Sequence, residues 1–221
     1  MLIQPDSKKM NDNKDNNYIE TAKEIRQSFR LLMNGVTSQS MREKGVDYRI
    51  NWGASLLHLR EMAAEYKPDK ELAITLWKDN VRECKIIATM LMPRDQFGKE
   101  LAMQWINQTH TQEIAEIATM NLYQYLPYAY DMALSLIGCE EDIKQIHGYN
   151  IFARVISQND SKVTSDDTSN FLKHAVTALK SENVALKHSA WNAITRFADI
   201  NQRYHNETRN ALKSIKMDDW L

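Results

Sequence analysis

The sequence is short of glycine and proline, the residues that form most tight turns. Its 221 residues include six glycines and four prolines, whereas a chain of average composition would hold about 26 of the two together. β-Sandwiches, β-barrels and nucleotide-binding α/β folds depend on such turns, so the composition argues against all three. Eleven methionines, together with abundant leucine and alanine, instead favour helices.

Cysteine is also scarce, and long apolar runs are absent. The two cysteines, Cys84 and Cys139, cannot form a disulfide framework, which predicts a reducing, cytoplasmic compartment. No run of about 20 apolar residues occurs, so we expect no membrane span. The opening residues MLIQPDSKKM lack the apolar core of a secretion signal.

The motifs of common enzymes are missing as well. The sequence has no glycine-rich phosphate loop, no Rossmann fingerprint, no HExxH and no nucleophile elbow. Its six histidines are too scattered to suggest metal ligands. We therefore expect neither a cofactor nor a metal, and any chemistry must come from side chains on helices.

The pattern along the chain is helical almost throughout. A polar segment rich in Asn, Asp and Lys predicts a disordered tail over residues 1–17, followed by a single domain over 18–221. Apolar residues then recur at steps of three and four, as Ala22, Ile25 and Phe29 do. Helices of about 10–18 residues with short joints follow from this pattern.

Several of these helices form consecutive pairs. The second helices of the pairs start near Arg82, Gln112, His147 and Lys187. Spacings of roughly 30–40 residues are in the period range of HEAT-type helical hairpins. This predicts an all-α fold, a right-handed α-solenoid of about eleven helices in HEAT-like hairpins. The helices expected to share its concave side are those near 81–91, 111–126, 147–157 and 187–200. An irregular helical bundle is the alternative.

Charge is unevenly distributed along a chain whose formal net charge is −1. Residues 100–169 hold ten acids and three bases, whereas residues 170–217 hold eight bases and three acids. A local positive excess can bind a polyanion such as nucleic acid. A solvated helix face is the more usual explanation of such an excess.

Three stretches of the sequence resemble one known family. The first is 45–93, with the motif residues Leu59-Arg60, Leu76-Trp77, Glu83, Lys85 and Ala88. The second is the helix TQEIAEIATMNLY, and the third is LKHSAWNAITRFA, which contains Lys187 and Trp191. Together they resemble the AlkD-type DNA alkylation-repair glycosylases, a family built from HEAT-like repeats.

The resemblance implies a positively charged groove that binds double-stranded DNA. It also implies an enzyme that removes N3- or N7-alkylated purines from that DNA. Glu116 stands where the family has its catalytic Asp, a carboxylate that stabilises the cationic sugar of the transition state. The groove wall would be formed by Gln112, Tyr149 and Trp191. The residues expected to contact the DNA backbone are Lys78, Arg82, Lys85, Lys187 and Arg196. We expect no membrane partner and a monomer.

The sequence departs from the family pattern at catalytic positions. Gln112 replaces a tryptophan, and Gly148-Tyr149 stand where the family has its groove arginine, while Arg154 follows on another face of that helix. Gln112, Glu116, Thr119 and Tyr123 are expected to form one stripe facing the groove, and core packing is the alternative role of Trp191.

Three functions follow as hypotheses. The first is an alkylpurine DNA glycosylase, and the second is a non-catalytic relative that binds damaged, bent or branched DNA. The third is a protein-interaction scaffold. DNA binding ranks first among them, with slow excision or none.

Overall fold

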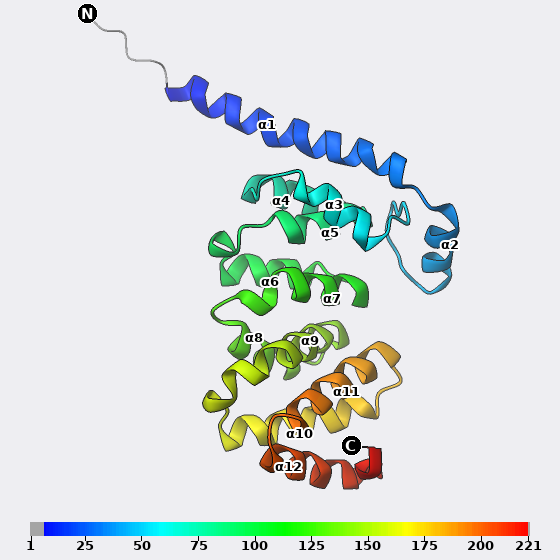
Figure 1. Ribbon diagram of the computed structural model, residues 1–221, viewed down its shortest axis with the longest axis vertical. Coiled ribbons are helices and arrows are strands. Elements are labelled where there is room, and N and C mark those ends of the chain that lie inside the picture. Colours follow the sequence, from blue (N-terminus) through cyan, green and yellow to red (C-terminus); the bar gives the residue numbers. More distant parts are fainter. Residues whose placement is uncertain (1–6, 221) are drawn as a thin grey trace, which may run out of the picture. The chain divides into compact units, whose positions relative to one another are not determined.

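The computed structural model describes residues 7–220, and for residues 7–16 and 160 it describes the backbone alone. Regular structure within this range is helical, apart from an isolated parallel bridge between Ile50 and Val81. The α-helices are α1 (Ser7–Ser28), α2 (Gly35–Glu43), α3 (Leu56–Ala64), α4 (Lys70–Trp77), α5 (Arg82–Leu91), α6 (Lys99–Asn107), α7 (Gln112–Asn121), α8 (Ala129–Ile137), α9 (Asp142–Asn159), α10 (Ser165–Leu179), α11 (Val184–Ala198) and α12 (Gln202–Leu212) (Figure 1). No helix of residues 7–220 is both long and apolar enough to cross a membrane.

The chain divides into two compact units, Met1–Phe97 and Gly98–Leu221. In the first unit α4 and α5 form an antiparallel pair, α3 packs on α5, and α1 packs on α4. Ala22, Ile25 and Phe29 are fully buried, as their spacing predicted. The prediction of one domain over 18–221 concerns both units together and stays a prediction.

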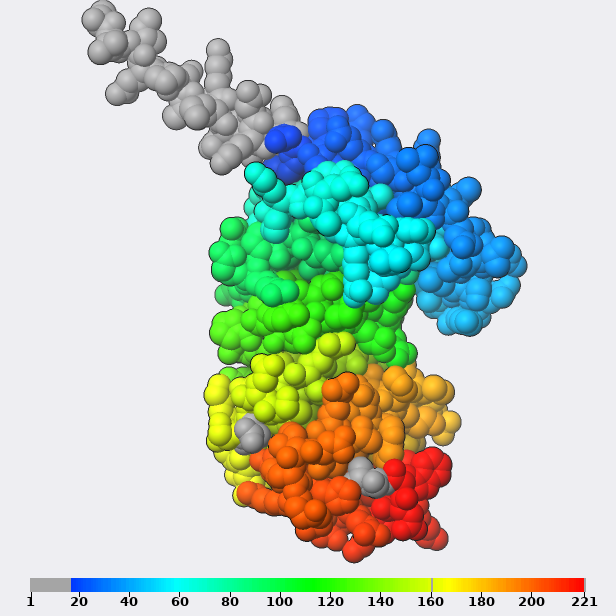
Figure 2. Space-filling view, in the orientation of Figure 1, coloured from blue at the N-terminus to red at the C-terminus, as the bar shows by residue number. Residues whose placement is uncertain are grey.

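The first helix begins earlier than the apolar spacing indicated. Residues 1–6 of the predicted tail lie outside the described residues, but α1 starts at Ser7. Its first half carries no apolar stripe, so periodicity could not reveal it; the helix continues backwards from the packed turns around Ala22. Another unpredicted helix, α2, buries none of its residues and protrudes from the first unit (Figure 2).

The second unit is built around α9. This helix packs against α7, α8 and α11, and α11 in turn packs against α10 and α12. The predicted neighbours α7, α9 and α11 therefore do lie side by side, with α9 in the middle. An aromatic cluster fills the core beneath them, including Phe152 and Phe171, whose rings stack with centroids 4.2 Å apart.

Gly148 permits the closest packing in this unit. A Cβ atom at Gly148 would lie 2.7 Å from the backbone nitrogen of Ile137 and 2.9 Å from the carbonyl oxygen of Ala133. Real Cβ atoms do not approach backbone so closely, hence only glycine lets α9 lie directly on α8. This contact fixes the rotation of α9, and with it the faces that its other side chains present.

Candidate nucleic-acid interface

Glu116 lies at the edge of a polar cleft of about 220 Å³ between α7, α9 and α11. All three helices belong to the second unit. The residues that line the cleft are Glu116, Asn150, Arg154, His188, Asn192 and Arg196. Four of the six can donate hydrogen bonds from neutral or cationic nitrogen atoms whatever the pH, namely the two arginines and the two asparagines.

Helical spacing brings these side chains to one place. Asn150 and Arg154 are four residues apart on α9, and His188, Asn192 and Arg196 follow one another at steps of four on α11. Side chains at this spacing lie one above another on a single helix face. Side-chain caps set where two of the helices begin, because Thr111 accepts from Ile114 N at the start of α7 and Asn183 accepts from the backbone at the start of α11.

The charges of the cleft are one carboxylate and two guanidinium groups. The Glu116 carboxylate accepts a hydrogen bond of 2.7 Å from Gln112 Nε2. Arg196 Nε donates to Asn192 Oδ1 at 3.4 Å. Within residues 17–220, neither Arg154 nor Arg196 takes part in an ion pair. Both guanidinium groups are exposed at the protein surface and available to an anion.

Asn150 adds a buried donor to the same cleft. The residue is 8% exposed, and its Nδ2 atom has no hydrogen-bond partner among the described residues. A buried amide without a partner costs free energy, so Asn150 Nδ2 is a donor available to a water molecule or a ligand. No cluster of three or more metal-binding side chains occurs in the described part of the chain.

The three predicted groove-wall residues, Gln112, Tyr149 and Trp191, differ in burial and in their position relative to the cleft. Gln112 is beside Glu116, but Tyr149 is fully buried, and its ring meets Phe171 edge to face. Burial also raises the pKa of Tyr149. Trp191 is half-buried on α11 and is not among the residues that line the cleft.

An arginine from another turn of α9, Arg154, lines the cleft. Tyr149 faces the core, whereas Arg154 lies on a different face, the one that lines the cleft. No role was predicted for Arg154 or for Asn150, His188 and Asn192. Their recurrence at steps of four was the signal that could have found them.

The expected stripe along α7 is shorter than predicted. Thr119 and Tyr123 are fully buried, so that only Gln112 and Glu116 of the four side chains reach the cleft region. Thr119 lies within α7 on its buried side, whereas Tyr123 follows the end of α7 at Asn121 and belongs to a 3₁₀ turn, η3 (Tyr123–Tyr125). A 3₁₀ turn advances 120° per residue, which breaks the α-helical register.

Three predicted DNA contacts fall in the first unit, where Lys78 is exposed, Lys85 half-buried and Arg82 buried. Lys78 is exposed at the end of α4. Lys85 Nζ donates to Trp77 O at 2.9 Å and lies 4.4 Å from the centroid of the Trp77 ring. Burial lowers the pKa of Lys85. Arg82 is 2% exposed, which does not fit a contact with a DNA phosphate.

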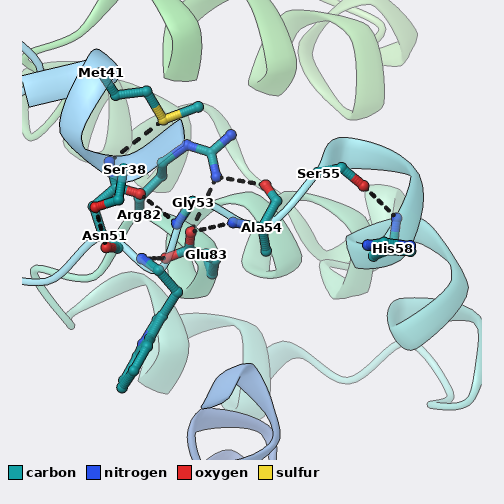
Figure 3. A network of polar contacts seen from close by, with 10 residues as sticks. Ser38, Met41, Asn51, Gly53, Ala54, Ser55, His58, Arg82 and Glu83 are labelled. Carbon is teal, nitrogen blue, oxygen red and sulfur yellow. Dashed lines mark hydrogen bonds and ion pairs between the residues drawn. The ribbon is translucent and has the colours of Figure 1, made fainter. Parts of the chain in front are cut away.

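Arg82 belongs instead to a buried polar network at the start of α5 (Figure 3). Arg82 Nη1 donates to Glu83 Oε1 at 3.0 Å and to Ala54 O at 2.9 Å. The Glu83 carboxylate also accepts from the backbone nitrogens of Trp52 and Ala54 at 3.2 and 3.3 Å. The network fastens the loop before α3 to α5, so Arg82 and the motif residue Glu83 stabilise the fold.

Consecutive helices that pack as pairs, as α4 with α5 and α8 with α9 do, are typical of helical-repeat proteins. A family model described as DNA alkylation repair enzyme matches residues 25–175. The chain therefore belongs to the DNA alkylation repair enzyme family.

A solved structure supports the same fold. It is described as a member of "a new family of proteins related to the HEAT-like repeat DNA glycosylases with affinity for branched DNA structures". The two chains are 15% identical and superpose with a TM-score of 0.74, over 86% of this chain and 81% of that chain. The predicted all-α HEAT-like repeat fold is thereby confirmed. No curated protein matches the sequence.

Proposed function

We propose that the protein binds double-stranded DNA at the cleft between α7, α9 and α11, and that it prefers branched or bent DNA to a straight duplex. The observation that carries this proposal is the pair of exposed arginines, Arg154 and Arg196, which share one cleft without a carboxylate partner. Membership of a DNA repair family supports DNA as the anion.

The cleft is suited to phosphate groups. Each guanidinium offers a planar set of donors that matches two phosphate oxygens. Asn150 Nδ2 lies nearby as a further donor that no described group satisfies. These contacts position a DNA backbone without reading its sequence.

The preference for branched DNA rests on shape. Phosphate contacts alone discriminate between DNA structures when the protein needs a geometry that a straight duplex reaches only at an energetic cost. The solved relative with this fold is described as having affinity for branched DNA structures, which supports the same preference here.

The cleft is less suited to recognising an alkylated base. N3- and N7-alkylated purines are cations, and aromatic faces attract cations. His188 is the one ring among the described residues that line the cleft, while Trp191 lies outside it. Gln112 offers an amide instead of an aromatic face, and this amide donates a hydrogen bond to Glu116. We therefore infer slow base excision or none.

Glycosylase activity is the second candidate, and Glu116 is the observation that favours it. Its carboxylate is exposed at the cleft and held by Gln112. A carboxylate placed within about 3–4 Å of the anomeric carbon would stabilise the developing sugar cation.

Binding titrations at low salt test the main proposal. A straight duplex and a four-way junction of the same sequence are titrated with the wild type and with Arg154→Gln/Arg196→Gln. The double variant should bind both DNAs at least tenfold more weakly, because charge-assisted contacts with phosphate are lost. Arg209→Gln, at an exposed arginine of α12, is the control and should change little. Equal affinity of wild type and double variant rejects the proposed cleft.

Excision is scored separately as base released from duplexes carrying N7-methylguanine or N3-methyladenine. If release occurs, Glu116→Gln should slow it about 100-fold or more with little loss of affinity, since the new charge exists only in the transition state. Glu100→Gln, at an exposed glutamate of α6, should leave the rate unchanged. Rapid release that survives Glu116→Gln would show that this residue has no catalytic role.

A further inference from the structure

A second hollow, also of about 220 Å³, lies in the first unit, apart from the residues of the proposed DNA cleft. It is bounded by α1, by η1 (Phe29–Leu32), by the segment 49–52 and by Asp79 and Val81. Val81 forms a β-bridge with Ile50 of that segment. Its wall combines apolar and aromatic side chains with a rim of basic ones.

The rim carries a clear positive excess. The lining includes four basic residues, Lys23, Arg26, Arg30 and Arg49. Asp79 is the one acidic residue in that lining. Asp79 is already paired with Arg26. Arg30 and Arg49 are exposed and form no hydrogen bond or ion pair through their side chains within residues 17–220. Such a rim attracts a phosphate group.

The wall offers a ring to stack on. Trp52 is half-buried and lines the hollow, while Phe29 and Val81 beside it are buried. Base stacking on tryptophan tolerates any sequence, because every base has a π face. Aromatic wall and cationic rim together match the two parts of a nucleotide, its base and its phosphate.

The segment that carries Trp52 is held in place from several sides. Trp52 N donates to Glu83 Oε2, and Trp52 O accepts from Asn34 N at 2.8 Å. Gly53, which follows, has a φ of +71°, and Asn51 Oδ1 accepts from its backbone nitrogen (Figure 3). A wall fixed in this way loses little conformational entropy when a ligand binds.

We propose that this hollow binds one unpaired nucleotide of a branched or flapped DNA, with the base stacked on Trp52 and the phosphates held by Arg30 and Arg49. A base inside a duplex is covered by its stacked neighbours and cannot enter, whereas a branch point or a flap presents unstacked bases. The inference rests on the proposed function for the choice of DNA, and it adds a contact that only DNA with an unpaired nucleotide can make.

Three probes test the inference: a plain duplex, the same duplex with a single-stranded flap, and a short oligothymidine. The wild type should bind the flapped duplex more tightly than the plain one. Trp52→Leu should remove about tenfold of this advantage, since a stacked base is lost. Trp220→Leu, at an exposed tryptophan of the second unit, is the matched control and should have no effect.

A second variant guards against loss of folding in Trp52→Leu. Arg30→Gln/Arg49→Gln changes two exposed side chains and should lower affinity for the flap and for oligothymidine while plain-duplex affinity stays within about twofold. Arg42→Gln, at an exposed arginine of α2 outside the hollow, is its control.

The outcomes separate this inference from the proposed function. If the variants bind flapped DNA as the wild type does, the nucleotide site is refuted while duplex binding stands. If oligothymidine binds through Trp52 but no duplex binds, the nucleotide site stands and the proposed cleft function fails. If no probe binds at low salt, both are refuted.

Discussion

His147 should make the stability of the protein depend on pH between neutral and mildly acidic conditions. The side chain is fully buried on α9, and its ring lies 5.6 Å from the ring of Tyr123. Neither ring nitrogen has a hydrogen-bond partner among the described residues. Burial alone lowers the pKa of His147 from 6.5 to about 3.

The sign of the effect follows from these two pKa values. In the unfolded chain the imidazole takes up a proton as the pH falls below 6.5, whereas in the folded chain it stays neutral until about pH 3. Protonation therefore favours the unfolded state, and stability is lost as the pH falls from 6.5 towards 3. At 1.36 kcal/mol per pH unit, the loss between pH 7 and pH 5 is about 2 kcal/mol.

Urea unfolding followed by circular dichroism at pH 7 and pH 5 measures this loss. The variant His147→Phe removes the titrating group and should lose about 2 kcal/mol less than the wild type over that interval. His205→Gln, at a half-exposed histidine of α12, should behave as the wild type does. Equal losses in the wild type and in His147→Phe would refute the reasoning, whatever the absolute stability of the variant.

Two further predictions concern packing and buried charge. Gly148→Ala should lower the free energy of unfolding, measured by calorimetry, by about 1–3 kcal/mol, because the new Cβ would overlap the backbone of α8. Gly35→Ala, where nothing lies within 4 Å, should be nearly neutral in the same measurement. Glu83→Gln should cost about 3–5 kcal/mol in urea unfolding, since Arg82 then stays buried without its carboxylate; a loss below about 1 kcal/mol would contradict the role of this pair.

Much of the helical architecture could be predicted because apolar spacing and capping residues are local signals. The start of α7 at Gln112, directly after the capping residue Thr111, follows from such signals. The helix α2 could not be predicted in this way, because it buries none of its residues and has no apolar stripe to detect.

The site was predicted in part, and the errors have a common physical cause. Sequence spacing shows which side chains share a helix face, but not which face the neighbouring helices leave open. Tyr149 and Asn150 are adjacent in the chain and differ by about 100° around the helix, so one is in the core and the other in the cleft.

Arg82 shows the same limit for charge. A basic residue near the start of a helix is usually exposed, and the sequence alone does not reveal that Glu83 and Ala54 surround it. Arg196, by contrast, was predicted to contact DNA, and it lies in the cleft with Glu116. Its contact with DNA stays a prediction.

The salt dependence of duplex affinity tests the proposed DNA cleft most directly. Each phosphate neutralised by a basic side chain adds a slope of about −0.9 to log K against log salt. The wild type should show a steep negative slope, and Arg154→Gln/Arg196→Gln should reduce its magnitude by about 1.8, because two phosphate contacts are lost. Parallel lines for the two proteins, or no duplex binding by the wild type at low salt, would contradict DNA binding at this cleft.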